Sequence, residues 1–308
     1  KKQIEANRNI TINLREIVKH MPKKSHPMDV ARTAVSVLGL EDKETNNNSP
    51  SANMRKAIRI FAKAPTAIAA FFRARKGKNI IPPKKKLSFS ENFFHMCFGK
   101  VPRKEIVKAF DVSLILYAEH SFNVSTFTAR TITSSLSDIH GAITGAIASL
   151  KGPLHGGANE EVMRMLKKIK NPVNAKKWIL DALENKEIIM GFGHRVYTKG
   201  DSRVPTMKKY YYKVAELLKE KKLPKISQII EDVMIEKKDI HPNVDYPTGP
   251  TYHLMGFDTD FFTPIFVMSR ITGWSAHIME QHAANKLIRP LSKYSGEKHR
   301  KVMPLNHR

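Results

Sequence analysis

Residues 152–170 read GPLHGGANEEVMRMLKKIK, and the second half of this stretch has the spacing of an amphipathic helix. The apolar residues recur at intervals of three and four, so they share one helix face: Val162, Met165, Leu166 and Ile169. Asn159 is placed to cap this helix, and Glu160 and Glu161 fall in its first turn, where carboxylates are favourable. The stretch therefore predicts a helix over residues 159–170, beginning just after His155.

Helical spacing recurs along most of the chain. It is found in two further apolar sets, Met207, Tyr210, Tyr211 and Val214, and then Ile226, Ile229, Ile230, Val233 and Met234. Further helices are expected over residues 1–18, 54–75, 104–119, 125–135, 175–184 and 263–281. Residues 44–51 and 76–86 are rich in Asn, Pro or Lys and are predicted to be surface loops. No apolar/polar alternation bounded by hairpin turns occurs, so the sequence predicts an all-α fold.

The composition narrows the class of protein. The chain has 308 residues, 41% of them hydrophobic, which is enough to bury a sizeable core, and no apolar run is long enough to span a membrane. The only cysteine is Cys97, so disulfides and cysteine-based metal sites are excluded and a reducing interior is expected, either cytoplasm or an organelle matrix. The chain begins with Lys1 rather than methionine, and we expect a fragment or processed product.

The formal net charge is +25, which would attract nucleic acid, an anionic membrane or acidic small molecules alike. The lysines are spread through most segments, and no zinc-finger spacing or RNA-recognition aromatic signature accompanies them. Such charge is more typical of solvated helix faces than of a binding stripe.

Three short motifs place ionisable residues beside glycine or proline. They are GPLHGGANE (152–160), GFGHRVY (191–197) and PNVDYPTG (242–249). Glycines let the backbone turn sharply and let a substrate approach closely. His155, His194 and Asp245 therefore suggest acid–base chemistry, in turns between helices.

Each motif also has a structural interpretation. A helix beginning near Glu160 would favour a neutral imidazole at His155, yet that histidine could equally fill a helix–turn contact. The Gly-x-Gly pair before His194 lacks the strand and third glycine of a dinucleotide fingerprint. Asp245 alone could be a solvated turn residue.

The basic residues near these motifs change the balance. Lys199 and Arg203 follow His194 and suit phosphate and carboxylate respectively. Arg270 and Arg289 stand in largely apolar sequence, where an unpaired guanidinium would be costly, so they require anions. No metal-binding spacing is present, and the sequence predicts no metal site.

These three motifs, in this order and with YAEHSFNVSTFTAR (117–130) upstream and NKLIRP (285–290) downstream, resemble the citrate synthase family over the whole chain. Residues 26–30, 256–281 and 294–308 are most similar to the 2-methylcitrate synthases of that family. The resemblance implies an all-helical homodimer. Its large domain would comprise residues 1–156 and 257–308, without an N-terminal part that family members carry, and its small domain residues 157–256.

The resemblance also implies residue roles. His155, His194 and Asp245 match the catalytic trio: Asp245 would remove a proton from the carbon beside the thioester, His155 would stabilise the enol or enolate, and His194 would polarise the ketone of oxaloacetate. The positions that hold carboxylates are matched by His120, Arg203, Arg270 and Arg289, the last supplied by the partner subunit. Coenzyme A would be bound by Ile188, Ile189, Met190, Gly191, Phe192, Lys199 and, with a weaker match, Lys238. Ser202 departs from the proline often found before that loop arginine, which implies a looser loop.

The implied reaction is condensation of propionyl-CoA with oxaloacetate and water to give 2-methylcitrate and CoA. An acyltransferase of this kind needs no metal or prosthetic group, and its partners are the two substrates and a second copy of the chain, with no membrane. Citrate synthase acting on acetyl-CoA is the first alternative, and a basic nucleic-acid-binding protein on a degenerate enzyme scaffold is an alternative of another class. The expected location is the cytoplasm, with the mitochondrial matrix as an alternative.

Overall fold

The computed structural model describes residues 1–197, 199–298 and 300–308, and its regular structure is helical. The helices are α1 (Lys2–Ala6), α2 (Ile12–His20), α3 (Pro27–Glu41), α4 (Pro50–Ala74), α5 (Phe89–Phe98), α6 (Lys104–Tyr117), α7 (Val124–Ser134), α8 (Ile139–Leu150), α9 (Ala158–Lys168), α10 (Pro172–Glu184), α11 (Val204–Leu217), α12 (Lys222–Lys238), α13 (Asp245–Leu254), the 3₁₀ turn η1 (Thr259–Phe261), α14 (Phe262–Ala283) and the 3₁₀ turn η2 (Leu305–His307). The described residues contain no β-strand, so the predicted all-α class is confirmed.

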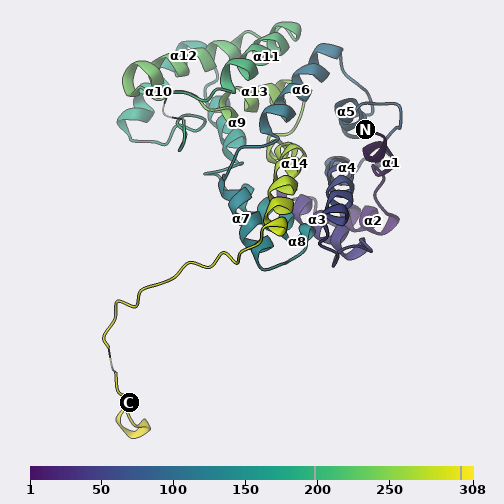
Figure 1. Ribbon diagram of the computed structural model, residues 1–308. Coiled ribbons are helices and arrows are strands. Elements are labelled where there is room, and N and C mark those ends of the chain that lie inside the picture. Colours follow the sequence, from purple (N-terminus) through teal and green to yellow (C-terminus); the bar gives the residue numbers. More distant parts are fainter. Residues whose placement is uncertain (198, 299) are drawn as a thin grey trace.

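Helix α14 is central to the packing. It contacts α4, α6, α7, α8 and α9, and its buried face carries Trp274 and Arg270. Helices α9 to α13 gather at the upper left of the helical body in Figure 1, whereas α2, α3, α4, α7 and α8 lie in the lower part of that body. After α14 the chain extends away from the helical body toward the C-terminus (Figure 1).

Helix α9 forms as its apolar spacing predicts, but its N-terminus differs in detail. The N-cap is Gly157, and Asn159 lies within the first turn, fully buried, with neither amide atom hydrogen-bonded. Glu160 is also buried, and its carboxylate accepts hydrogen bonds from Thr263 and Arg164. The predicted capping role of Asn159 is therefore wrong, because the turn after His155 enters the helix two residues earlier.

The structure also corrects the helix expected over residues 1–18, which is divided into α1 and α2. Thr11 caps α2 by accepting the backbone N–H of Leu14 at 3.0 Å. Between the helices, buried Arg8 donates to the carbonyls of Lys84 and Leu87 at 3.2 and 2.9 Å. This tertiary contact holds residues 7–11 in a non-helical path.

The loop expected over residues 76–86 is confirmed, and that over residues 44–51 ends two residues earlier because α4 begins at Pro50. Helices α3, α5, α8 and α13 were not assigned from the sequence. The last of these matters for function, since its first residue is Asp245, which was expected in a turn. Among the residues that the structure describes, no helix combines the length and apolar character needed to cross a membrane.

Candidate active site

A cavity of about 750 Å³ is lined by residues of α6, α9, α13 and α14 and by residues of the segments 119–124, 153–155 and 188–197. Its lining contains most of the residues predicted from the sequence: His120, His155, His194, Arg203, Asp245, Arg270, Ile188, Ile189, Met190, Gly191 and Phe192. The structure therefore brings all three motif residues to one place. These lining residues are spread over 150 positions of the chain, from His120 to Arg270, so only folding joins them.

Asp245 begins α13 and faces the cavity. Tyr117, fully buried on α6, donates its hydroxyl to Asp245 Oδ1 at 2.5 Å. Burial raises the pKa of Asp245 to about 6, although the Tyr117 hydrogen bond and the charge of Arg203 oppose the increase. A carboxylate with such a pKa is a stronger base than an ordinary aspartate and is still ionised at neutral pH.

His155 lies in the turn between α8 and α9. Its Nε2 accepts the backbone N–H of Ser125 at 3.3 Å and lies 2.8 Å from the Ser125 hydroxyl. Because a backbone N–H can only donate, the proton of the neutral ring is on Nδ1. Burial, with smaller contributions from the charges of Arg270 and His120, lowers the pKa of His155 to about 4. The neutral imidazole expected from the sequence is supported, but burial rather than the end of α9 is the main cause.

The partners of His155 were not predicted. Ser125 Oγ accepts the indole N–H of Trp274 at 3.1 Å, and the Ser125 hydroxyl lies 2.7 Å from Asn123 Oδ1. Trp274 is fully buried in α14. This chain of contacts, which comes from α7 and α14, fixes the orientation of the histidine. Sequence spacing could not reveal it, because Ser125 and Trp274 are 149 positions apart.

His194 is fixed by its own loop. Its Nδ1 accepts the backbone N–H groups of Val196 and Tyr197 at 3.1 and 3.2 Å, so the neutral ring carries its proton on Nε2. Burial lowers the pKa of His194, and the nearby charge of Arg203 adds to this. The His120 and His194 rings lie edge to face with their centroids 5.0 Å apart, and His120 Nε2 is 3.1 Å from the Tyr197 hydroxyl.

The His194 loop is attached to the segment that precedes Asp245. Phe192 and Pro242 form an isolated antiparallel bridge, and the N–H of Asn243 donates to the carbonyl of Gly191 at 2.8 Å. The side chain of Asn243 donates to the Gly193 carbonyl at 3.0 Å and accepts the N–H of Asp245 at 3.1 Å. Asn243, another residue without a predicted role, thus joins the His194 loop to the segment that carries Asp245.

Arg270 is the most unusual group in the cavity. Its side chain is almost completely buried, and Nε donates to the Tyr117 carbonyl at 2.6 Å while Nη1 is buried without a hydrogen-bond partner. Burial, together with the charge of Arg203, lowers the pKa of Arg270 to about 10, so the group still carries its positive charge. No carboxylate among the described residues lies within ion-pair distance of it. A buried, incompletely paired guanidinium in a cavity is suited to an anionic ligand.

His120 lines the cavity together with Arg203 and Arg270. Burial, followed by the charges of Arg203 and His194, lowers the pKa of His120 to about 4, so it is a neutral hydrogen-bonding group near pH 7. Arg203 keeps its charge by pairing with Asp201, which outweighs the cost of burial and raises the pKa of Arg203. The cavity therefore offers the guanidinium groups of Arg203 and Arg270 beside neutral histidines.

Five of the predicted coenzyme-binding residues, Ile188, Ile189, Met190, Gly191 and Phe192, line the cavity. Gly191 has φ of +85°, and a Cβ there would lie 2.6 Å from Val162 Cγ2, so only glycine fits. Ile188 is 77% exposed, whereas Ile189 is buried. The segment thus contributes the exposed side chain of Ile188 and the backbone of Gly191 to the lining of the cavity.

Three predicted site residues do not line this cavity. Lys199 is exposed in the loop after His194, and Lys238 is exposed at the end of α12. Arg289 is exposed on the segment after α14, outside the cavity of its own chain. The apolar residues around Arg289 are themselves on the surface, Leu287 being 61% exposed.

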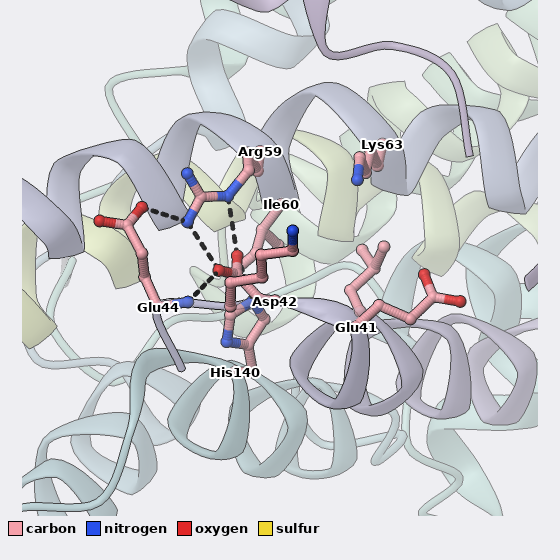
Figure 2. Close-up of a pocket in the computed structure, with 9 residues that line it drawn as sticks. Glu41, Asp42, Glu44, Arg59, Ile60, Lys63 and His140 are labelled. Atoms are coloured by element: carbon pink, nitrogen blue, oxygen red, sulfur yellow. Dashed lines mark hydrogen bonds and ion pairs between the residues drawn. The ribbon is translucent and has the colours of Figure 1, made fainter. Parts of the chain in front are cut away.

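A second cavity, of about 450 Å³, lies between α3, α4 and α8 (Figure 2). In its lining, Arg59 contacts Asp42 through two bonds of 2.8 Å and Glu44 through one of 2.9 Å. None of the predicted site residues lines it. The first cavity, which contains a base of raised pKa and an unpaired buried cation, is therefore the candidate active site.

The first cavity combines the parts needed to remove a proton next to a carbonyl group and to stabilise the charge that develops. Asp245 is suited to act as a base, neutral His155 and His194 can donate hydrogen bonds, and the arginines are suited to carboxylates.

Comparison with known proteins agrees with this chemistry. The family model "Citrate synthase, C-terminal domain" matches residues 1–291. A 2-methylcitrate synthase of Mycobacterium tuberculosis is 52% identical over 97% of this chain and 75% of the relative. A citrate synthase of Mycolicibacterium smegmatis is 50% identical over 97% of this chain and 80% of the relative.

Solved structures give the same result. Citrate synthase of Thermoplasma acidophilum, in a ternary complex with carboxymethyl coenzyme A and oxaloacetate, superposes with a TM-score of 0.92 at 31% identity, covering 100% of this chain and 82% of that one. Citrate synthase of Thermotoga maritima has a TM-score of 0.87 at 36% identity with the same coverage. This chain belongs to the citrate synthase family and is an acyltransferase of the citrate synthase type.

Proposed function

We propose that this enzyme condenses propionyl-CoA with oxaloacetate and water to give 2-methylcitrate and CoA. The single observation that carries the chemistry is the buried Nη1 of Arg270, which has no partner in a cavity shared with the raised-pKa base Asp245. A dicarboxylate would supply the missing anion. The acyl preference is supported by the sequence blocks that resemble 2-methylcitrate synthases and by the 52% identity to such an enzyme.

In the proposed mechanism, Asp245 takes a proton from the carbon beside the thioester. His155 donates a hydrogen bond from Nδ1 to the thioester oxygen and stabilises the enol or enolate, because its Nε2 is already occupied by Ser125. His194 donates from Nε2 to the ketone oxygen of oxaloacetate, because its Nδ1 accepts two backbone N–H groups. The nucleophilic carbon then attacks the polarised ketone carbon, and hydrolysis of the thioester releases CoA.

The proposed substrate contacts use the same cavity-lining residues. Arg203, Arg270 and His120 would hold the oxaloacetate carboxylates, and the backbone of residues 188–192 would meet the adenine of coenzyme A. Lys199 and Lys238, both exposed, would meet its phosphates. We propose no metal or prosthetic group, so dialysis against a chelator should leave turnover unchanged, and a loss restored by a divalent cation would contradict this part.

We further propose that residues 157–256 form a small domain that closes on a large domain of residues 1–156 and 257–308. The boundaries fall at Gly157, beside Gly156, and at Gly256, whose φ is +91°. Because Arg289 is outside the cavity of its own chain, we propose that a partner subunit of a homodimer supplies it. The free, buried thiol of Cys97 fits a reducing compartment, and we propose the cytoplasm.

Free-thiol release should be measured with propionyl-CoA and with acetyl-CoA, each with oxaloacetate. A higher kcat/KM for propionyl-CoA is expected, with measurable use of acetyl-CoA, because one methylene is worth about 1–3 kcal/mol in a pocket. A clear preference for acetyl-CoA would favour the second candidate, citrate synthase, which the 50% identical relative of that name supports. Asp245→Ala should abolish release with both thioesters while the far-ultraviolet circular dichroism stays unchanged.

A further inference from the structure

Asp201 is a buried carboxylate next to the candidate active site that has not been given a role. Its side chain has no exposed surface. Oδ1 accepts the backbone N–H of Arg203 at 3.0 Å and its Nε at 2.9 Å. Oδ2 accepts Nη2 of Arg203 at 2.7 Å and the backbone N–H of Val244 at 3.0 Å. One carboxylate thus joins a substrate-binding arginine to the residue directly before Asp245.

The contacts with Arg203 decide which edge of its guanidinium can meet a ligand. Nε and Nη2 are both occupied by Asp201 in a two-point pair, which fixes the plane of the group. Nη1 has only a long contact of 3.5 Å with the Leu116 carbonyl, and Arg203 lines the cavity. Asp201 therefore leaves one guanidinium nitrogen for a substrate carboxylate.

The contact with Val244 fixes the start of α13. Val244 is the N-cap residue of that helix and has no side-chain cap, and Asp245 is the first helical residue. A carboxylate from the loop 194–203 accepts the N–H of this capping residue, across 43 positions of the chain. Both carboxylate oxygens of Asp201 thus hold the arginine, and Oδ2 also holds the residue directly before the base.

We propose that Asp201 is a positioning residue that holds the free edge of Arg203 and the N-terminus of α13 in one fixed arrangement, so that the substrate carboxylate and the base Asp245 are aligned. This inference rests on the proposed function for the identity of the substrate. Its physical basis is that a buried carboxylate is tolerated when several donors satisfy it, and here four donors belong to the two segments that must be aligned.

Asp201 also acts on Asp245 through its charge. The charged and titratable groups that face Asp245 are Tyr117 from α6, Arg270 from α14, and Asp201 and Arg203 from the loop before α11. Burial raises the pKa of Asp245, and the negative charge of Asp201 adds to this increase. Removing that charge, which also leaves Arg203 without its counter-ion, should lower the pKa of Asp245.

The test uses Asp201→Asn, Asp201→Glu, Arg203→Gln and the double variant Asp201→Asn/Arg203→Gln in the full chain. The first readout needs no enzymatic activity: the Asp245 carboxyl group is titrated by NMR in protein labelled with ¹³C-carboxyl aspartate. The Asp245 signal is assigned by its loss in Asp245→Asn. We expect Asp201→Asn to titrate Asp245 at lower pH than the wild type, and Asp201→Glu to keep the wild-type midpoint. An unchanged midpoint in Asp201→Asn would overturn the electrostatic part of the proposal.

The second readout is steady-state kinetics with oxaloacetate as the varied substrate. Each Asp201 variant should lose kcat/KM on the order of tenfold or more, because small misplacements of reacting groups are costly. The double variant should be no worse than Arg203→Gln alone in KM, because Asp201 acts on binding through Arg203. Additive losses in KM would contradict this.

Hydrogen exchange decides the structural half of the proposal. Peptides that cover residues 241–247 should exchange faster in Asp201→Asn than in the wild type, whereas peptides of α3 should not change. Asp201→Asn could fail to fold because Arg203 is left without its counter-ion. In that case hydrogen exchange is measured on Asp201→Asn/Arg203→Gln, which lacks both charges. Unaltered exchange at the start of α13 would refute the anchor. A wild-type enzyme without turnover would refute the proposed function alone, since titration and exchange still test Asp201.

Discussion

Replacing Asp245 by asparagine should inactivate the enzyme and at the same time stabilise its fold above pH 6. The folded-state pKa of Asp245 is raised from 3.8 to about 6, so the folded protein binds this proton more tightly than the unfolded chain does. The stabilisation from the bound proton is complete below pH 3.8 and is lost as the pH rises through about 6. Since one pKa unit corresponds to about 1.4 kcal/mol, ionised Asp245 destabilises the native state by about 3 kcal/mol at pH 8.

Asparagine has the shape of the protonated acid and can still accept the Tyr117 hydroxyl, so it should avoid this cost. Urea unfolding at pH 8 and pH 4.5, followed by circular dichroism, measures the difference. We expect a gain of about 3 kcal/mol for the variant at pH 8 that shrinks greatly at pH 4.5. Asp181→Asn, an exposed aspartate on α10, is the matched control and should show no gain. A variant that is less stable than the wild type at pH 8, or equally shifted at both pH values, would refute the reasoning.

Three further outcomes follow from particular contacts. Arg270→Gln should raise KM for oxaloacetate on the order of a hundredfold without lowering the urea midpoint of unfolding, because the removed guanidinium is buried and incompletely paired. Steady-state kinetics and urea unfolding check this, and a large loss of stability would contradict it. Ser125→Ala should lower kcat on the order of tenfold with little change in KM for oxaloacetate, because Nε2 of His155 loses a partner at 2.8 Å; equal kcat in variant and wild type would count against that role. Gly191→Ala should lower the unfolding free energy by about 1–3 kcal/mol and raise KM for the acyl-CoA, because the new Cβ would lie 2.6 Å from Val162 Cγ2 at a positive φ; unchanged values for both would show that the loop adapts.

The pH dependence of turnover offers a check on the assignment of the base. Activity should rise with pH through about 6, because Asp245 must lose its proton to act. His155 and His120, whose pKa values are lowered to about 4, stay neutral over that interval and contribute no limb there.

The sequence by itself predicted the class of the fold and the three ionisable residues that meet in the first cavity. Apolar residues spaced at three and four positions specify a helix wherever they occur, because that spacing alone places them on one face. Likewise, the glycines and prolines around His155, His194 and Asp245 mark places where the backbone turns and a ligand can approach. Both signals are local, so a single chain contains them in full.

Tertiary structure decided everything that depends on neighbours distant in the chain. It showed that Asn159 is not a cap, that α13 starts at Asp245 and that Arg289 lies outside its own cavity. Burial among residues from α6, α11 and α14 sets the pKa of Asp245, and Asp201 receives its function only through Arg203 and Val244. Desolvation and long-range hydrogen bonds have no counterpart in local spacing, because they arise when separate segments exclude water together.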